Sequence, residues 1–170
     1  DRLRSRGLGD VYKRQVVIGT HPHVLEPVEV VSDTKGHEML VYYSLGNFVS
    51  NQDQKPRMIG GMAKMTLVKD ETGCYVKNYN LTPVITQKLF GKKAITTYKL
   101  SDYTESLASG NAIRNDSGCS DFSLSYCQTL VKQILGDDYD ESTSELNVSL
   151  HPDGLVTVSY THLTLPTICS

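Results

Sequence analysis

The residue types best suited to chemistry in this 170-residue chain gather in the segment Gly19-Thr20-His21-Pro22-His23. Neutral imidazole is a common ligand of zinc, iron and manganese, and two histidines flanking a proline can point from a rigid loop toward one locus. The segment follows residues 16–18, a β-branched run that predicts a short buried strand. Ligands usually bind at the carboxyl ends of strands, so His21 and His23 are candidate metal ligands. The alternative is a pair of ordinary surface or capping histidines.

Asn47 is a third candidate, because the segment Ser44-Leu45-Gly46-Asn47 ends another predicted strand. Its amide could contact substrate in the same cleft as the histidines, and it could equally cap its own turn. Two further histidines, His37 beside Gly36 and His151 in a His-Pro-Asp-Gly turn, are expected to be surface positions. Because its amide could reach the cleft, Asn47 is the candidate substrate-binding residue.

The elements that must position these residues are mostly β-strands between residues 16 and 90. Apolar, β-branched and aromatic runs there are short and separated by turn residues. Two alternating segments around the Asp70-Glu71-Thr72-Gly73 turn predict a hairpin. The expected fold class is α/β, with mostly antiparallel strands after the first. The predicted strands span residues 16–19, 28–31, 39–44, 60–68 and 74–81.

The second half of the chain changes to helical spacing. Ser101 or Asp102 is expected to cap a short helix that is followed by a longer one. Asp121 is expected to cap this longer helix over residues 122–135, whose apolar side chains fall on one face. Gly136 lies just past the last turn, where glycine commonly ends helices.

The two ends are expected to be non-native tails. Residues 1–15 and 158–170 resemble translated sequencing-adapter read-through, and the alternative for the first is a genuine basic arm. Between them, residues 16–136 are expected to form a partial domain and 137–157 an acidic linker or C-terminal segment. The carboxylates of that segment lack the ligand spacing and the glycine of an EF-hand loop.

Composition narrows the function classes. The chain is 39% hydrophobic and 21% charged, which is typical of globular proteins, and its net charge of −2 disfavours nucleic acid as a partner. No run approaches the length of a membrane span, and no signal peptide is evident at the N-terminus. The four cysteines form no C-x-x-C pair, so no zinc ribbon is expected. A disulfide between Cys119 and Cys127 is conceivable, but packed or free thiols are favoured.

Two ordered motifs carry a family resemblance: residues 17–29, VIGTHPHVLEPVE, and residues 43–49, YSLGNFV. Together they resemble the C-terminal part of the bacterial capsule synthesis protein CapA family, which is associated with poly-γ-glutamate and resembles calcineurin-like metallophosphatases. The resemblance extends from Val16 to about Asn111. It implies that the chain holds the C-terminal part of a metallophosphatase-like layered β-sandwich with flanking helices.

The same resemblance implies a metal site. In the metallophosphatases a final G-H-x-H element supplies ligands to a dinuclear centre of divalent metal ions, and its histidines match His21 and His23. Thr20 and Pro22 are local variants of the element. The family's earlier elements, D-x-H, G-D and G-N-H-D/E, have no counterpart before Gly19. The remaining ligands are therefore expected upstream in a longer parent, and the chain alone is expected to be inactive.

Two functions stay open for that parent. The first is a metal-dependent, phosphoesterase-like hydrolase of capsule or poly-γ-glutamate biosynthesis, which acts on a phosphoester or a cell-surface polymer. The second is a non-catalytic binding or assembly module of the cell-surface polymer machinery. By resemblance, the parent is expected at the cell envelope, membrane-anchored or on the extracellular face, with membrane-bound capsule synthesis machinery as a partner.

Overall fold

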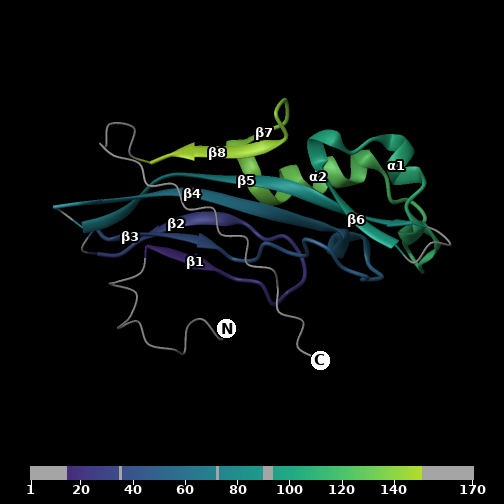
Figure 1. Ribbon diagram of the computed structural model, residues 1–170, viewed down its shortest axis with the longest axis horizontal. Coiled ribbons are helices and arrows are strands. Elements are labelled where there is room, and N and C mark those ends of the chain that lie inside the picture. Colours follow the sequence, from purple (N-terminus) through teal and green to yellow (C-terminus); the bar gives the residue numbers. More distant parts are fainter. Residues whose placement is uncertain (1–14, 35, 72, 90–93, 151–170) are drawn as a thin grey trace.

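The computed structural model describes residues 15–34, 36–71, 73–89 and 94–150. Two β-sheets form successive layers, and the helices gather beside the second sheet, away from the first (Figure 1). This is the expected α/β architecture, a layered β-sandwich with mostly antiparallel strands and few helices. The expected non-native tails and His151 lie outside the described residues, except for Gln15.

The first sheet has three strands, β1 (Val16–Ile18), β2 (Val28–Ser32) and β3 (Glu38–Tyr42), in the order β1-β3-β2. β1 runs parallel to β3, while β2 pairs with β3 in antiparallel fashion. The three predicted strands are confirmed with small shifts at their ends. Because β1 ends at Ile18, it leads directly into residues 19–23, the histidine loop.

The second sheet is built on a long hairpin of β4 (Ile59–Asp70) and β5 (Gly73–Leu89), which confirms the predicted hairpin. β6 (Ala94–Lys99), β7 (Tyr139–Asp140) and β8 (Glu145–Ser149) complete it. The strand order is β4-β5-β8-β7, with β6 also paired to β5. The pattern of the sequence did not reveal β6.

β5 continues past its predicted end at residue 81 and contains Pro83. This proline lies opposite Gly61 of β4. On the other edge of β5, pairing with β8 reaches Leu81, and pairing with β6 includes Val84. Pro83 thus lies where the neighbouring strand changes, a position at which a residue without an N–H is tolerated.

The described part of the acidic segment after residue 136 contributes two strands to the second sheet. Its strands β7 and β8 extend the second sheet, and Leu146 is buried opposite Leu81. The Asp140 carboxylate accepts hydrogen bonds from the Ser142 N–H and hydroxyl at 2.8 and 2.7 Å, which shapes the turn. The alternation of Leu146 and Val148 with polar neighbours gives β8 one buried face.

The helical layer contains α1 (Glu105–Ser109) and α2 (Leu124–Leu135). The caps differ from those expected, because Thr104 caps α1 and Ser123 caps α2. Asp121 instead pairs with Lys55 at 2.6 Å. Within the described ranges, no helix is long and apolar enough to cross a membrane. Short 3₁₀ helices lie at Lys55–Met58, Leu100–Asp102, Ala112–Asn115 and Gly136–Asp138.

One hydrophobic core joins the layers. Tyr42 of the first sheet meets Tyr79 of the second edge to face, with ring centroids 6.3 Å apart. Burial, and secondarily Tyr79, raises the pKa of Tyr42, so its phenol stays protonated and donates to the Asn80 carbonyl at 3.1 Å. On the helical side, Phe122 and Val131 are fully buried in the same core.

Cys119 and Cys127 are both buried free thiols, which is the alternative that the sequence favoured. Burial, followed by the charge of Glu105, raises the pKa of Cys127 to about 12. A thiol with so high a pKa carries little thiolate at neutral pH, so Cys127 acts as a packing residue.

Substitution of the two helix-start residues separates their roles. Ser123→Ala is expected to lower the free energy of unfolding by about 1 kcal/mol, because the Ser123 hydroxyl accepts from the Tyr126 N–H. Asp121→Ala is expected to change it less, since the Asp121 carboxylate is exposed. Urea unfolding followed by circular dichroism measures both, and a larger loss for Asp121→Ala would contradict the cap assignment.

Candidate functional site

The histidine loop leaves β1 and runs along the end of β3. The Gly19 N–H donates to the Tyr42 carbonyl at 2.8 Å, which continues the β1–β3 ladder by one bond. His21 and His23 follow, and both are exposed. His23 has a φ of 61°, the left-handed region that non-glycine residues seldom adopt. The loop therefore presents both imidazoles to solvent, and His23 does so from an unusual backbone conformation.

Asn47 lies against this loop and contacts His23 twice. Its Oδ1 is 2.8 Å from His23 Nδ1, and its Nδ2 donates to the His23 carbonyl at 3.1 Å. The same Nδ2 donates to the Arg57 carbonyl at 3.0 Å. Of the three candidate site residues, the structure brings Asn47 and His23 together. No side-chain hydrogen bond joins His21 to either of them in the described part of the chain.

Three glycines make this approach sterically possible. A Cβ at Gly19 would lie 2.0 Å from the Tyr43 carbonyl oxygen, and one at Gly60 would lie 2.2 Å from the Asn47 carbonyl oxygen. Gly46 has a φ of 64°, and its Cβ would lie 2.7 Å from the Ile59 carbonyl oxygen. Any side chain at these positions would push the segments apart, so the site depends on backbone-to-backbone contact.

Backbone hydrogen bonds fill these contacts. The Leu45 N–H donates to the Gly19 carbonyl at 3.2 Å, and the Gly61 N–H donates to the Leu45 carbonyl at 2.8 Å. Leu45 also bridges to Leu25, and Gly46 bridges to Gly60 at the start of β4. These bonds and bridges connect the histidine loop, the Asn47 segment and the start of β4.

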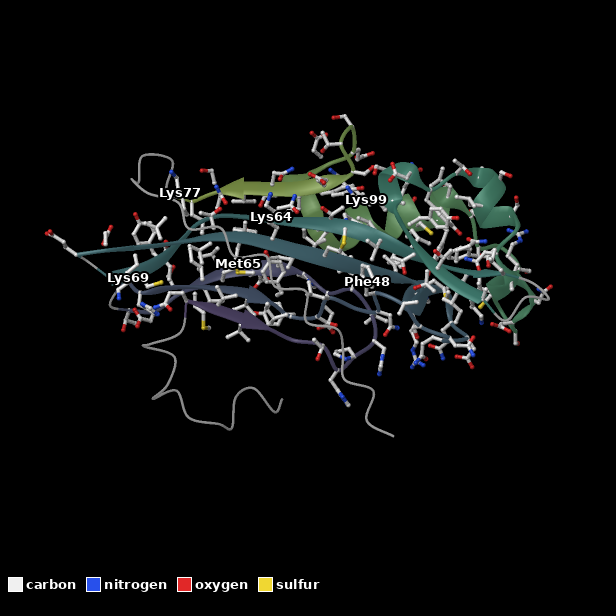
Figure 2. The ribbon with its side chains drawn as sticks, in the orientation of Figure 1. Phe48, Lys64, Met65, Lys69, Lys77 and Lys99 are labelled. Carbon is white, nitrogen blue, oxygen red and sulfur yellow. The ribbon has the colours of Figure 1, made fainter. Side chains whose placement is uncertain are left out.

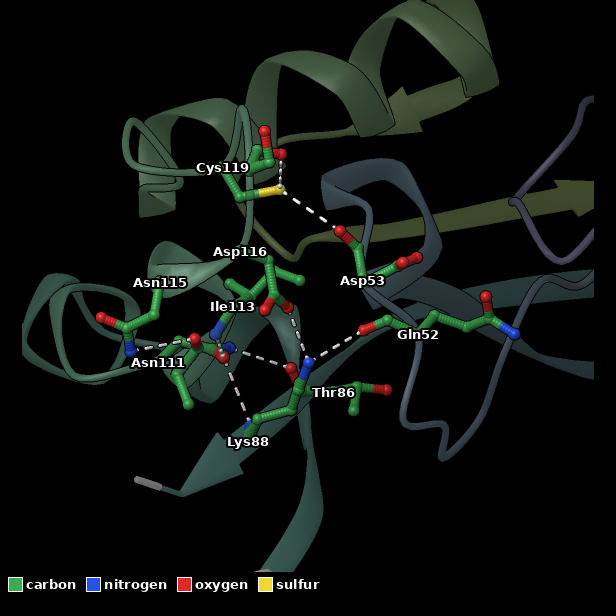
Figure 3. A network of polar contacts seen from close by, with 11 residues as sticks. Gln52, Asp53, Thr86, Lys88, Asn111, Ile113, Asn115, Asp116 and Cys119 are labelled. Carbon is green, nitrogen blue, oxygen red and sulfur yellow. Dashed lines mark hydrogen bonds and ion pairs between the residues drawn. The ribbon is translucent and has the colours of Figure 1, made fainter. Parts of the chain in front are cut away.

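Asn47 lies in the segment between β3 and the 3₁₀ helix at Lys55–Met58. Side chains from β5 and from the helical part of the chain, residues 100–138, hold the end of this segment at residues 52 and 53 (Figure 3). Lys88 of β5 donates through Nζ to the Gln52 carbonyl at 3.0 Å and to Asp116 Oδ2 at 2.9 Å. The Cys119 thiol lies 3.5 Å from the Asp53 carbonyl oxygen. The Lys88 side chain is 15% exposed, so this ion pair is only partly screened. Both ends of the segment that carries Asn47 are thus fixed.

Asn111 ties β5 to the helical half beside this anchor. Its Nδ2 donates to the Thr86 carbonyl at 3.0 Å and to the Tyr103 hydroxyl at 3.1 Å, while its Oδ1 accepts from the Ile113 N–H. Asn111 is 2% exposed. A buried amide with these partners is satisfied, so the network stabilises the fold and needs no functional explanation.

The donor set at the loop fits a divalent cation in chemistry but is incomplete in number. Exposed imidazole nitrogens suit transition metals, and Asn47 supports the ring of His23. Among the described residues, no group of three or more His, Cys, Asp or Glu side chains comes together to hold a metal. The Glu29 carboxylate of β2 accepts from the Tyr43 hydroxyl at 3.1 Å, and this bond raises the pKa of Tyr43.

A polar groove of about 560 Å³ lies elsewhere, on the second sheet. Lys64, Asn80 and Asn147 form one cross-strand row of β4, β5 and β8. The Glu145 carboxylate accepts from Thr82 at 3.0 Å and from the amides of Asn80 and Asn147 at 3.3 Å each. The groove is lined by Lys64, Asn78, Tyr79, Asn80, Thr82, Lys99, Glu145, Asn147, Val148 and Ser149.

The groove faces away from the first sheet. Figure 2 shows Lys64 and Lys99 on the outer side of the second sheet and Met65 on the side toward β1–β3. Within the described ranges, neither of these lysines forms an ion pair. Sequence reasoning missed both the groove and the role of Gly60, although alternating asparagines and a Gly-Gly pair in a predicted strand were available as signals.

Comparison with known proteins points to one family. Residues 12–52 match the family model described as bacterial capsule synthesis protein PGA_cap. That stretch contains β1, the histidine loop, β2, β3 and Asn47. The chain is also 36% identical over 86 residues to the PGA biosynthesis protein CapA of Bacillus subtilis (strain 168).

The second similarity covers 49% of this chain and 20% of the relative. The chain therefore spans about a fifth of the length of the curated protein that it matches. No solved structure is significantly similar to this chain.

Replacement of Gly60 tests the backbone contact beneath the site. Gly60→Ala is expected to lower the free energy of unfolding by about 3 kcal/mol, because its Cβ would collide with the Asn47 carbonyl. Gly110→Ala is the control, since Gly110 has a φ of −86° and its nearest atom would be 3.3 Å away. That variant is expected to stay within about 1 kcal/mol of the wild type. Equal losses in urea unfolding would show that the close approach is unimportant.

Proposed function

Since this chain carries part of a CapA-like capsule synthesis protein, we propose that it contributes the histidine loop of a metal-dependent, phosphoesterase-like hydrolase. The observation that carries the proposal is the pairing of an exposed imidazole with a fixed amide, at 2.8 Å between His23 Nδ1 and Asn47 Oδ1. The matched family segment contains both residues. The remaining ligands belong to parts of the longer protein outside this chain.

In this proposal His21 and His23 are the metal ligands of the chain. Both are exposed at the end of a strand, and Gly19 and Leu45 hold the loop to the neighbouring segment. A divalent cation, when bound, supplies polarisation of a phosphoryl oxygen and activation of water. The chain's own contribution is to present two imidazoles from a backbone that the glycine contacts keep rigid.

A second candidate function is supported by the polar groove. Amides, hydroxyls and two lysines line it, and the Glu145 carboxylate is already hydrogen bonded to its neighbours. Such a surface can hold a polar polymer without any metal. In this alternative the protein is a non-catalytic binding or assembly module of the cell-surface polymer machinery, and the histidines are ordinary loop residues.

The family similarity also supports a proposal for location and partners. We place the longer protein at the cell envelope, where a polymer or phosphoester substrate and membrane-bound capsule synthesis machinery would be its partners. The name of the Bacillus subtilis relative, a PGA biosynthesis protein, supports this placement.

Metal binding by the chain alone is expected to be weak. With two proposed ligands, elemental analysis after dialysis should find less than one metal ion per chain. Calorimetric titration with Zn²⁺ should show an affinity that falls at low pH, because both imidazoles must be unprotonated to coordinate. His21→Ala and His23→Ala should each weaken binding, while His37→Ala in the β2–β3 turn should not. A stoichiometric dinuclear site would contradict the proposed division of ligands.

The full-length protein tests catalysis directly. His21→Ala and His23→Ala should lower metal content and phosphoesterase activity together, while circular dichroism stays unchanged because an exposed loop imidazole adds little to the core. His37→Ala serves again as the control. Unchanged metal content with intact capsule assembly would show that the ligand assignment is wrong. Loss of metal with intact assembly would favour the binding module.

A further inference from the structure

We propose that Asn47 is a positioning residue for His23, which holds the imidazole in the tautomer that leaves Nε2 free for a divalent cation. The identity of the ligand, a divalent cation, rests on the proposed function, but the contact between Asn47 and His23 is a property of this chain. The positioning role also differs from a substrate-binding role for Asn47, because the Asn47 amide hydrogens have other partners.

The orientation of the Asn47 amide is fixed by two backbone carbonyls. Nδ2 lies 3.1 Å from the His23 oxygen and 3.0 Å from the Arg57 oxygen. A carbonyl oxygen can only accept, so the nitrogen of the amide must face both of them. The flipped amide would set two pairs of oxygens against each other. The Asn47 Oδ1 must therefore be the atom that faces the ring of His23.

The tautomer of His23 follows from that orientation. Oδ1 is an acceptor only, so Nδ1 at 2.8 Å must carry the hydrogen and donate it. A neutral imidazole has one N–H, which leaves the lone pair on Nε2. This is the arrangement of metal-binding histidines, whose second ring nitrogen typically donates to a fixed oxygen.

The backbone of His23 is held by the same side chain. His23 has a φ of 61°, and its carbonyl accepts from Asn47 Nδ2 while its ring donates to Asn47 Oδ1. One amide therefore sets both the strained backbone and the ring. Asn47 is itself held through Gly46 and Gly60, so the direction of Nε2 is set by the sheet and not by a mobile loop.

Nuclear magnetic resonance of the ¹⁵N-labelled, metal-free chain tests the tautomer without any activity assay. At about pH 9, above the ordinary titration range of histidine, two-bond ¹⁵N–¹H correlations should show His23 protonated at Nδ1. Asn47→Ala should move the His23 ring toward the tautomer mixture of a free side chain. Asn47→Asp keeps an acceptor oxygen for Nδ1–H, but its second oxygen would face both carbonyls, so the preference for the Nδ1–H tautomer is expected to weaken. His21 is the internal reference and should not change.

Protonation of wild-type His23 at Nε2 would overturn the proposal, as would a folded Asn47→Ala variant with an unchanged His23 ring. If Asn47→Ala does not fold, the His23 tautomer of the wild-type chain decides the question. Addition of Zn²⁺ then separates this inference from the proposed function. A Zn²⁺-induced chemical-shift change at His23 Nε2 supports the positioning role and the metal-ligand proposal together. An Nδ1–H tautomer whose resonances do not change with Zn²⁺ supports the positioning role and contradicts the metal-ligand proposal. In the full-length protein, Asn47→Ala should lower Zn²⁺ affinity on the order of 10-fold or more.

Discussion

The site depends on one constraint, which is the contact of three backbone segments with no side chain between them. Gly19, Gly46 and Gly60 stand where a Cβ would lie within 2.0 to 2.7 Å of a neighbouring carbonyl oxygen. Because the segments touch, Asn47 can reach the histidine loop and donate to two carbonyls. Without these glycines the loop would separate from β4, and the two family motifs would no longer meet.

The helical half of the chain matters to the site although it lies outside the matched family model. The backbone at residues 52 and 53 is held by Lys88, which also pairs with Asp116, and by Cys119. The Lys55–Asp121 ion pair then links the 3₁₀ helix at Lys55–Met58 to the residues that precede α2. Partly buried ion pairs and bonds to backbone carbonyls act here as anchors more than as sources of stability. The candidate site residues are thus held from both sheets and from the helices.

Two surfaces of the protein support two kinds of function, and they are separate in the fold. The histidine loop follows β1 of the first sheet. Lys64 and Lys99 of the polar groove lie on the outer side of the second sheet (Figure 2). The proposed hydrolase would use the first surface together with further ligands, while the alternative polymer-binding module would use the second. The two proposals are compatible, since binding a polymer and cleaving a bond near it need different side chains.

The sequence by itself determined the strands of residues 16–81, the main helix and the pairing of motifs that indicates the family, because periodicity and short motifs are local properties. It placed His21 and His23 after a strand but left Asn47 open between a turn and the cleft. Only the tertiary structure places Asn47 against His23, since this contact joins residues that are 24 positions apart in the chain. Tertiary structure also determined that β6 forms, that β7 pairs with β8, and which residues cap the two helices. A strand such as β8 is stabilised by its partner β5, and a cap depends on which nearby hydroxyl reaches the helix, so neither can be inferred from local pattern alone.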